Sequence, residues 1–265
     1  MANSNNNGDF NRIRSIVEQL TILELAKVKD VDVCAAKLAQ LRVDGAKKLQ
    51  VICDFDHTFT KHHEPDGTPC WTSHQVFDVE TMKRNRVIGE KLIALRDHYM
   101  AIEFSPTVPQ VEKAKAMVEW WTQAHQRIEQ SGFTRDMLRE FVHRGDLRFR
   151  DFAVEFVRSL EKLHVPWLMF SAGLGDVIDI KLRNDIRPYP ANLLLISNMM
   201  TFSEPPEHKL YVLITTVAIA MTHHLIVKRR KEIVARHRFG DVCQRHVVLI
   251  ASSFVTTLAK TTEMV

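Results

Sequence analysis

The chain alternates between stretches with helical spacing of apolar residues and short, mostly apolar runs. Apolar residues recur every three or four positions over residues 10–41 (as two runs), 79–99, 110–130 and 148–163, which predicts amphipathic helices. The short apolar runs lie at residues 49–53, 165–170, 193–196 and 247–250. Runs of this length, interspersed with helices, are typical of buried strands in a parallel sheet. The pattern therefore predicts an α/β protein.

Composition supports a globular protein and excludes some classes. The 265 residues are 45% apolar and 26% charged, and the formal net charge of +4 is mixed rather than clustered, so we expect no nucleic-acid partner. Four scattered cysteines with no CxxC pair are typical of a reduced, cytoplasmic protein rather than a disulfide framework. The Asn-rich start lacks the apolar stretch of a signal peptide, and we expect residues 1–9 to be a disordered tail.

Two carboxylates, Asp54 and Asp56, follow the apolar run at residues 49–53. Side chains two apart at a strand's end point the same way, and the carboxyl edge of a parallel sheet is where such folds bind ligands. Paired carboxylates in a cleft favour a hard divalent cation, and Mg²⁺ suits them better than zinc. Asp54 is then placed to attack phosphorus, and Asp56 to protonate the leaving alcohol and activate water. An Asp-rich turn without chemistry is the competing interpretation.

A second candidate site follows the apolar run at residues 165–170. Ser171, Ala172 and Gly173 are predicted to turn the chain from a strand into a helix that starts near Asp176. A hydroxyl and backbone amides between a strand and a helix make a phosphate cradle. Ser171 and the Ala172 backbone are the predicted phosphate binders, against the alternative of a buried Ser-Gly turn.

These motifs resemble those of a known family. Residues 54–60, Asp-Phe-Asp-His-Thr-Phe-Thr, resemble the first motif of haloacid-dehalogenase-like phosphohydrolases, and most closely that of the type III cytosolic pyrimidine 5′-nucleotidases. The segments at residues 101–103, 117–122, 170–177 and 197–202 resemble further signatures of that family, in order. The resemblance covers about residues 46–202. It implies a three-layer core with a parallel sheet and an inserted helical cap, a magnesium cofactor and a nucleoside monophosphate substrate.

The resemblance also implies a division into domains. Residues 10–48 would be amino-terminal helices that associate with the cap, with an interaction helix as the alternative. Residues 49–60 and 148–202 would form the core, residues 61–147 the cap, and residues 203–265 an aberrant carboxyl-terminal segment.

Two cap residues are candidates for recognising the nucleoside. Glu103 matches a family glutamate that binds the base or sugar edge, and a carboxylate accepts hydrogen bonds from an exocyclic amine such as cytosine N4. A glutamate on the cap surface is the alternative. Trp121 is the candidate for stacking on the base, against the alternative that both Trp120 and Trp121 pack inside the cap.

The polar loop at residues 61–74 holds several histidines and carboxylates, but its spacing fits no zinc motif. We interpret it as a solvated loop leading into the cap.

The family pattern breaks after Phe202. A lysine that would neutralise the phosphate is absent, and residues 251–254, Ala-Ser-Ser-Phe, replace the acidic motif that would complete the magnesium shell. Three interpretations stay open: an enzyme that has lost its second carboxylate pair, a membrane segment at residues 210–227, or a shifted reading frame. Of these we do not favour the membrane segment.

The predicted function is magnesium-dependent hydrolysis of nucleoside 5′-monophosphates, with pyrimidines favoured. The rivals are a catalytically impaired nucleotide-binding relative, which lacks half of the metal shell, and phosphotransfer to another nucleoside.

Overall fold

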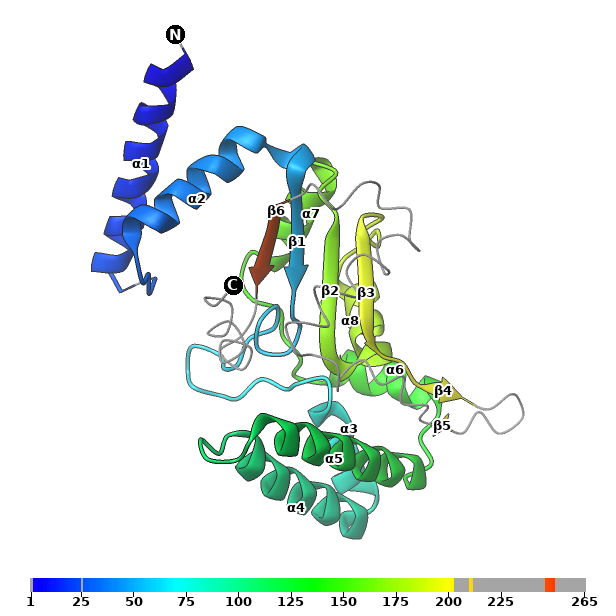
Figure 1. The fold of residues 1–265 in the computed structure, drawn as a ribbon. Helices are drawn as coiled ribbons and strands as arrows, with labels where there is room; N and C mark the ends of the chain where they lie inside the picture. Colours follow the sequence, from blue (N-terminus) through cyan, green and yellow to red (C-terminus); the bar gives the residue numbers. More distant parts are fainter. Residues whose placement is uncertain (1, 25, 203–209, 212–245, 251–265) are drawn as a thin grey trace.

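The computed structural model of the chain describes residues 2–24, 26–202, 210–211 and 246–250 (Figure 1). The helices are α1 (Ala2–Ile22), α2 (Val31–Asp44), the short 3-10 helix η1 (Ala46–Lys48), α3 (Gln75–Arg84), α4 (Arg86–Glu103), α5 (Gln110–Gln130), α6 (Arg135–Arg144), α7 (Ala153–Lys162) and α8 (Gly175–Asp185). The strands are β1 (Leu49–Cys53), β2 (Trp167–Leu174), β3 (Leu193–Asn198), β4 (Thr201–Phe202), β5 (Leu210–Tyr211) and β6 (His246–Ile250).

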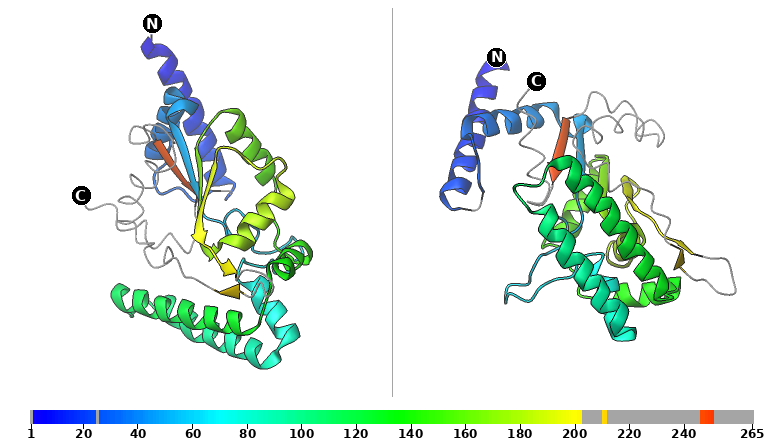
Figure 2. Two further views of the ribbon diagram at one scale, coloured as in Figure 1. Left: turned by 90° about the vertical axis from the view of Figure 1, so that its right-hand side faces the viewer. Right: turned by 60° about the horizontal axis from the view of Figure 1, so that its bottom comes forward.

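A parallel sheet of four strands in the order β3-β2-β1-β6 forms the core, and this confirms the predicted α/β fold class. The central strand β1 buries four of its five residues. Helices α7 and α8 lie along one face of the sheet (Figure 2). Large side chains, among them Trp167, Met169 and Ile178, are fully buried between the sheet and these helices. Strands β4 and β5 form a separate antiparallel pair.

The strand predictions succeed at β1 and are too short elsewhere. β1 has the predicted bounds, and β6 lies parallel to β1 where a strand was expected at residues 247–250. The prediction that the chain turns at Ser171–Gly173 is wrong, because β2 continues to Leu174. Its pairing with β3 is irregular between Phe170 and Leu174, so the strand bends without ending.

The predicted helix at residues 79–99 is two helices. Asn85 ends α3 in a non-helical conformation, and its side chain accepts a hydrogen bond from the backbone N–H of Ile88 at the start of α4. An asparagine cap of this kind satisfies a free amide and starts a new helix. The apolar spacing continues across this break of one residue, which is why spacing alone did not reveal it.

Two further helix boundaries differ from the prediction. The helix expected from residue 148 starts at Ala153, because Phe149 instead pairs with Thr60 as an antiparallel bridge. Helix α6, which was not predicted, begins after Thr134, whose hydroxyl accepts from the Met137 amide.

The amino-terminal helices differ from expectation in extent and place. The tail predicted to be disordered belongs to α1, which begins at Ala2; extending an existing helix adds a hydrogen bond per residue without the cost of nucleation. Helices α1 and α2 pack against each other, away from α4 and α5, which lie beyond the other end of the sheet (Figure 1). The predicted association of these helices with the cap is therefore not what the structure has, because helical spacing does not say what a face packs against.

Most of the predicted aberrant segment at residues 203–265, including the membrane interpretation of residues 210–227, lies outside the described residues. Only the backbone of β5 and β6 is described there. Among the described residues, no helix is long and apolar enough to cross a membrane.

Candidate active site

Asp54 and Asp56 lie directly beyond the carboxyl end of β1, as predicted. Phe55 between them is fully buried, and its carbonyl accepts hydrogen bonds from the amides of Thr58, Phe59 and Thr60. The Phe55 ring packs against Phe59 and, edge-on, against Phe149. Because Phe55 anchors this loop inside the core, the loop that carries the two carboxylates is held in one conformation.

Each carboxylate has a hydrogen-bond partner of its own. The Thr58 hydroxyl donates to Asp54 Oδ2 at 2.9 Å. Asp56 accepts two bonds from Ser73, from the amide to Oδ1 at 2.7 Å and from the hydroxyl to Oδ2 at 2.6 Å. Burial raises the pKa of Asp56 to about 6, which the Ser73 bonds oppose and the nearby Asp54 reinforces. A carboxyl group with a pKa near neutrality can both give and take a proton.

The predicted phosphate-binding segment lies beside this pair. Ser171 is buried, and its Oγ accepts from the Gly173 amide at 3.0 Å. The Ala172 carbonyl accepts from Asn198 Nδ2 at 2.7 Å. A Cβ added to Gly173 would lie 2.7 Å from Asp56 Oδ2 and 3.2 Å from Ser171 Oγ. Only a residue without a side chain lets the end of β2 approach Asp56 this closely, so Ser171, Gly173 and Asp56 form one site.

Glu103 is the last residue of α4 and is partly buried. Burial raises its pKa, and Lys113 of α5 lowers it. In the part of the chain that the structure describes, Glu103 has no hydrogen bond or ion pair to the residues around β1. Its role in binding the nucleoside stays a prediction.

Trp121 belongs to a group of stacked rings rather than standing alone. Its ring centroid lies 4.3 Å from that of His74 and 5.2 Å from that of Trp120. His125 of α5 lies 5.8 Å from Trp121 and is only 2% exposed. Trp121 therefore belongs to a group of rings that begins at His74, next to Ser73, and its role in stacking on the base stays a prediction.

Sequence reasoning missed Ser73, His74 and His125. His74 was assigned to a solvated loop, yet its Nε2 is buried, and burial together with His125 places its pKa well below the usual value. Burial lowers the pKa of His125 to about 4. The available signal was the spacing of Thr72 and Gln75, which exchange hydrogen bonds as a capping box and mark the start of α3.

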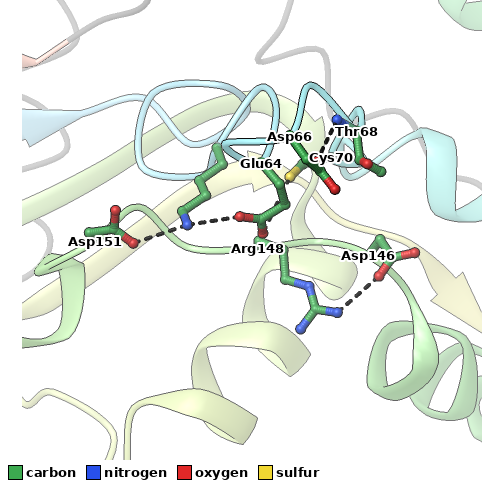
Figure 3. Close-up of polar contacts among 8 residues, drawn as sticks. Glu64, Asp66, Thr68, Cys70, Asp146, Arg148 and Asp151 are labelled. Carbon is green, nitrogen blue, oxygen red and sulfur yellow. Dashed lines mark hydrogen bonds and ion pairs between the residues drawn. The ribbon is translucent and has the colours of Figure 1, made fainter.

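Ion pairs and a hydrogen bond hold the loop after β1 (Figure 3). Lys61 Nζ pairs with Glu64 at 3.1 Å and with Asp151 at 3.0 Å, and Asp66 accepts from the Thr68 amide. Cys70 points toward Glu64 in the same group. Among the described residues, no group of three or more His, Cys, Asp or Glu side chains is arranged to hold a metal ion.

A parallel sheet with two carboxylates after β1 and a Ser-Ala-Gly segment at the end of β2 defines a haloacid-dehalogenase-like α/β protein. The model of the family described as "Pyrimidine 5′-nucleotidase (UMPH-1)" matches residues 57–250. This match covers well over half of the chain, so the chain belongs to the pyrimidine 5′-nucleotidase (UMPH-1) family. The match starts just after Asp56 and continues to Ile250, so the resemblance does not end at Phe202 as expected.

Curated relatives agree with this family. The chain is 36% identical over 177 residues to "Putative cytosolic 5′-nucleotidase 3" of Caenorhabditis elegans, covering 67% of this chain and 47% of that protein. It is 37% identical over 168 residues to "7-methylguanosine phosphate-specific 5′-nucleotidase" of Gallus gallus, covering 62% of this chain and 56% of that protein. The chain thus spans about half the length of the curated relatives it matches.

A solved structure shares the fold. The crystal structure of cytosolic 5′-nucleotidase IIIB bound to cytidine superposes with a TM-score of 0.53 at 25% identity, covering 71% of this chain and 62% of that one.

Proposed function

We propose that this chain hydrolyses nucleoside 5′-monophosphates to nucleoside and phosphate, with pyrimidine nucleotides as the first substrates to test. The observation that carries the proposal is the convergence of Asp54, Asp56, Ser171 and Gly173 at the ends of adjacent strands β1 and β2. The family's description and the names of its relatives support the substrate class. Because several relatives are named for 7-methylguanosine phosphate, the 7-methylguanosine monophosphate is the second substrate to test.

Asp54 is the proposed nucleophile, and Asp56 is the proposed general acid and base. An oxygen of Asp54 attacks phosphorus, the bond from phosphorus to the nucleoside O5′ breaks, and protonated Asp56 gives its proton to the leaving O5′. Asp56, now a carboxylate, takes a proton from water, and the resulting hydroxide attacks the aspartyl-phosphate. The bond from phosphorus to Asp54 then breaks, which releases phosphate and restores both side chains. Ser171 and the Ala172 backbone are the proposed phosphate contacts, Glu103 the contact to the nucleoside, and Trp121 with His74 the stacking surface.

The oxygen donors at the end of β1 are of the chemical type that binds magnesium. The carboxylate of Asp54 and the main-chain carbonyl of Asp56 are hard oxygen ligands of the type Mg²⁺ prefers. When bound, the ion would neutralise charge on the phosphoryl group. The described residues supply only these two protein ligands, because no third acidic side chain joins them there. This favours, as the second candidate, a relative that binds nucleotides without turning them over.

Phosphate release from the full chain tests the proposal. CMP, UMP, 7-methylguanosine monophosphate and AMP are compared with and without Mg²⁺, and an Asp54→Asn variant is the control. We expect turnover that needs Mg²⁺ and falls at least about a thousandfold in the variant, as for the loss of other catalytic nucleophiles. Nucleotide binding by a folded chain without any phosphate release would contradict hydrolysis and support the non-catalytic relative. Products that depend on an added nucleoside acceptor would instead reveal the phosphotransfer reaction.

We further propose that the protein is cytoplasmic, as the name of its worm relative states for that protein.

A further inference from the structure

The hydroxyl of Ser73 joins three segments that are far apart in the sequence. It donates to Asp56 Oδ2 at 2.6 Å, after β1, and it accepts from the Leu174 amide at 3.2 Å, at the end of β2. Ser73 itself lies two residues before the first residue of α3, the helix that leads into α4 and α5. The Ser73 side chain is fully buried. One hydroxyl therefore links the acid/base carboxylate, the phosphate-binding segment and the base of the cap.

The direction of these bonds is fixed while Asp56 is a carboxylate. A hydroxyl has one proton, and because the Leu174 amide must donate, Ser73 Oγ accepts from that amide and donates its hydrogen bond to Asp56. The Ser73 amide donates to the other carboxylate oxygen, Oδ1, at 2.7 Å. With both oxygens held by the same residue, the plane of the Asp56 carboxylate follows the position of the Ser73 backbone.

The Ser73 backbone is in turn fixed by the start of α3. Thr72 and Gln75 on either side exchange hydrogen bonds, from the Thr72 amide to Gln75 Oε1 at 2.8 Å and from the Gln75 amide to Thr72 Oγ1 at 3.2 Å. The amide of Trp71 donates to the Asp146 carbonyl at 3.0 Å. A shift of α3 would therefore move Ser73 and rotate the carboxylate that it holds.

We propose that Ser73 is a positioning residue that orients Asp56 for proton transfer and makes this orientation depend on the placement of the cap. The proposal rests on the proposed hydrolysis and adds to it a residue that does not touch the substrate. Its consequence is specific: loss of the Ser73 hydroxyl should slow steps in which Asp56 must deliver a proton, and spare those in which it need not.

Two phosphate esters distinguish a step that needs a proton from Asp56 from a step that does not. The leaving nucleoside of CMP is a poor leaving group and needs protonation, whereas the nitrophenolate of para-nitrophenyl phosphate leaves without it. The rate of leaving-group release in the first turnover is measured by rapid quench for the parent chain and for Ser73→Ala. We expect a loss of about ten- to a hundredfold with CMP, within the range that general acid catalysis supplies, with KM little changed. With para-nitrophenyl phosphate we expect less than about a threefold change.

A second variant, Gly173→Ala at the end of β2, disturbs the same contact between Ser73 and Asp56. In Gly173→Ala the new Cβ would fall on Ser73 Oγ and within 2.7 Å of Asp56 Oδ2, so these side-chain ends must move. We expect the same dependence on the leaving group. Ser159→Ala is the matched control, because Ser159 lies at an exposed position of α7 and its hydroxyl, among the described residues, donates only to the Glu155 carbonyl.

The outcomes are distinct. Equal losses on both esters in Ser73→Ala, or no loss on CMP, would overturn the positioning role while leaving the proposed hydrolysis intact. A parent chain that is inactive on both esters would overturn the proposed function and this inference with it. Thermal unfolding of each variant, followed by tryptophan fluorescence, shows whether an equal loss comes from unfolding.

Discussion

Burial shifts the pKa values of Asp56 and His125 in opposite directions for the same reason. Removal from water disfavours the charged form, which is the deprotonated form of Asp56 and the protonated form of His125. The pKa of Asp56 therefore rises to about 6, and that of His125 falls to about 4. The Asp56 shift suits proton transfer, while the His125 shift makes stability depend on pH.

His125 should make the fold sensitive to acid. Both of its ring nitrogens are buried without a hydrogen-bond partner among the described residues. The pKa of His125 in the folded state lies below the unfolded value of 6.5. Its contribution to the free energy of unfolding is therefore complete above pH 6.5 and is lost as the pH falls toward 4. The linked loss of unfolding free energy is about 3 kcal/mol. Urea unfolding at pH 7 and near pH 4 measures it.

The His125→Phe variant should remove that part of the pH dependence, because phenylalanine fills a similar space and does not titrate. His143→Phe makes the same change at an exposed histidine of α6 and is the matched control. If the difference in stability between the two pH values is the same in the parent chain and in His125→Phe, burial of His125 is not the cause.

The sequence predicted those site residues that follow their strand directly. Asp54 and Asp56 are found because their spacing and the apolar run before them are local features. Ser73, His74 and His125 reach the site through the packing of α3 and α5 against the core. No local pattern at residue 125 indicates that its neighbour in space is residue 74.

At the scale of elements, Gly89 shows how closely α3 and α4 pack. A Cβ at Gly89 would lie 2.7 Å from the Cα of Met82, a backbone atom that cannot move aside alone. Helix propensity by itself would make Gly89→Ala stabilising by up to about 1 kcal/mol. The clash with Met82 outweighs this gain in helix propensity. We therefore expect Gly89→Ala to lower the free energy of unfolding by about 1–3 kcal/mol, measured in urea.

Gly8→Ala is the matched control for this prediction. Gly8 also lies inside a helix, α1, but a Cβ there would meet nothing within 4 Å. We expect it to be neutral or slightly stabilising. A stabilising Gly89→Ala would show that α3 and α4 are farther apart than described.

Arg150 binds the backbone of the loop that carries Asp54 and Asp56. Its guanidinium donates to the carbonyls of Thr58 and His57, both at 2.7 Å, and its amide donates to the Phe59 carbonyl. Arg150→Ala loses both side-chain bonds, and because the side chain is exposed we expect a modest loss of stability, about 1 kcal/mol, together with lower phosphate release.

The chain offers a matched control two residues away. Among the described residues, Arg148 forms an ion pair with Asp146 alone, and both side chains are 57% exposed, so Arg148→Ala should change stability by less than about 0.5 kcal/mol. Equal effects of the two substitutions, measured by thermal unfolding and phosphate release, would rule out the specific hold of Arg150 on the loop.

The bounds of a helix or strand could be predicted where the apolar pattern alone determines them. β1 has the expected bounds because a compact, mostly apolar run leads directly to the two carboxylates, and α5 has them because its helical apolar spacing continues over 21 residues. The break at Asn85 and the extension of β2 past Ser171 depend on a single cap and on an irregular strand pairing. Both are decided by contacts with other elements and leave the apolar spacing unchanged.

For the whole molecule, the sequence gives the sheet and the identity of its carboxyl edge, but not the placement of every helix. Helices α1 and α2 keep several apolar side chains exposed, including Ile22 and Val43. Their helical pattern was correct and their expected location beside the cap was not. The acidic motif that would follow β6 is replaced by residues 251–254 in the sequence, and this makes catalytic competence the central question.

Trapping the covalent intermediate answers that question most directly. The chain is mixed with CMP and Mg²⁺, quenched in acid within the first turnover and digested with pepsin, and the peptides around β1 are analysed by mass spectrometry. We expect one phosphoryl group on Asp54 in the parent chain and none in Asp54→Asn. Phosphate release without any phosphorylated Asp54, or the same modified peptide in Asp54→Asn, would contradict it.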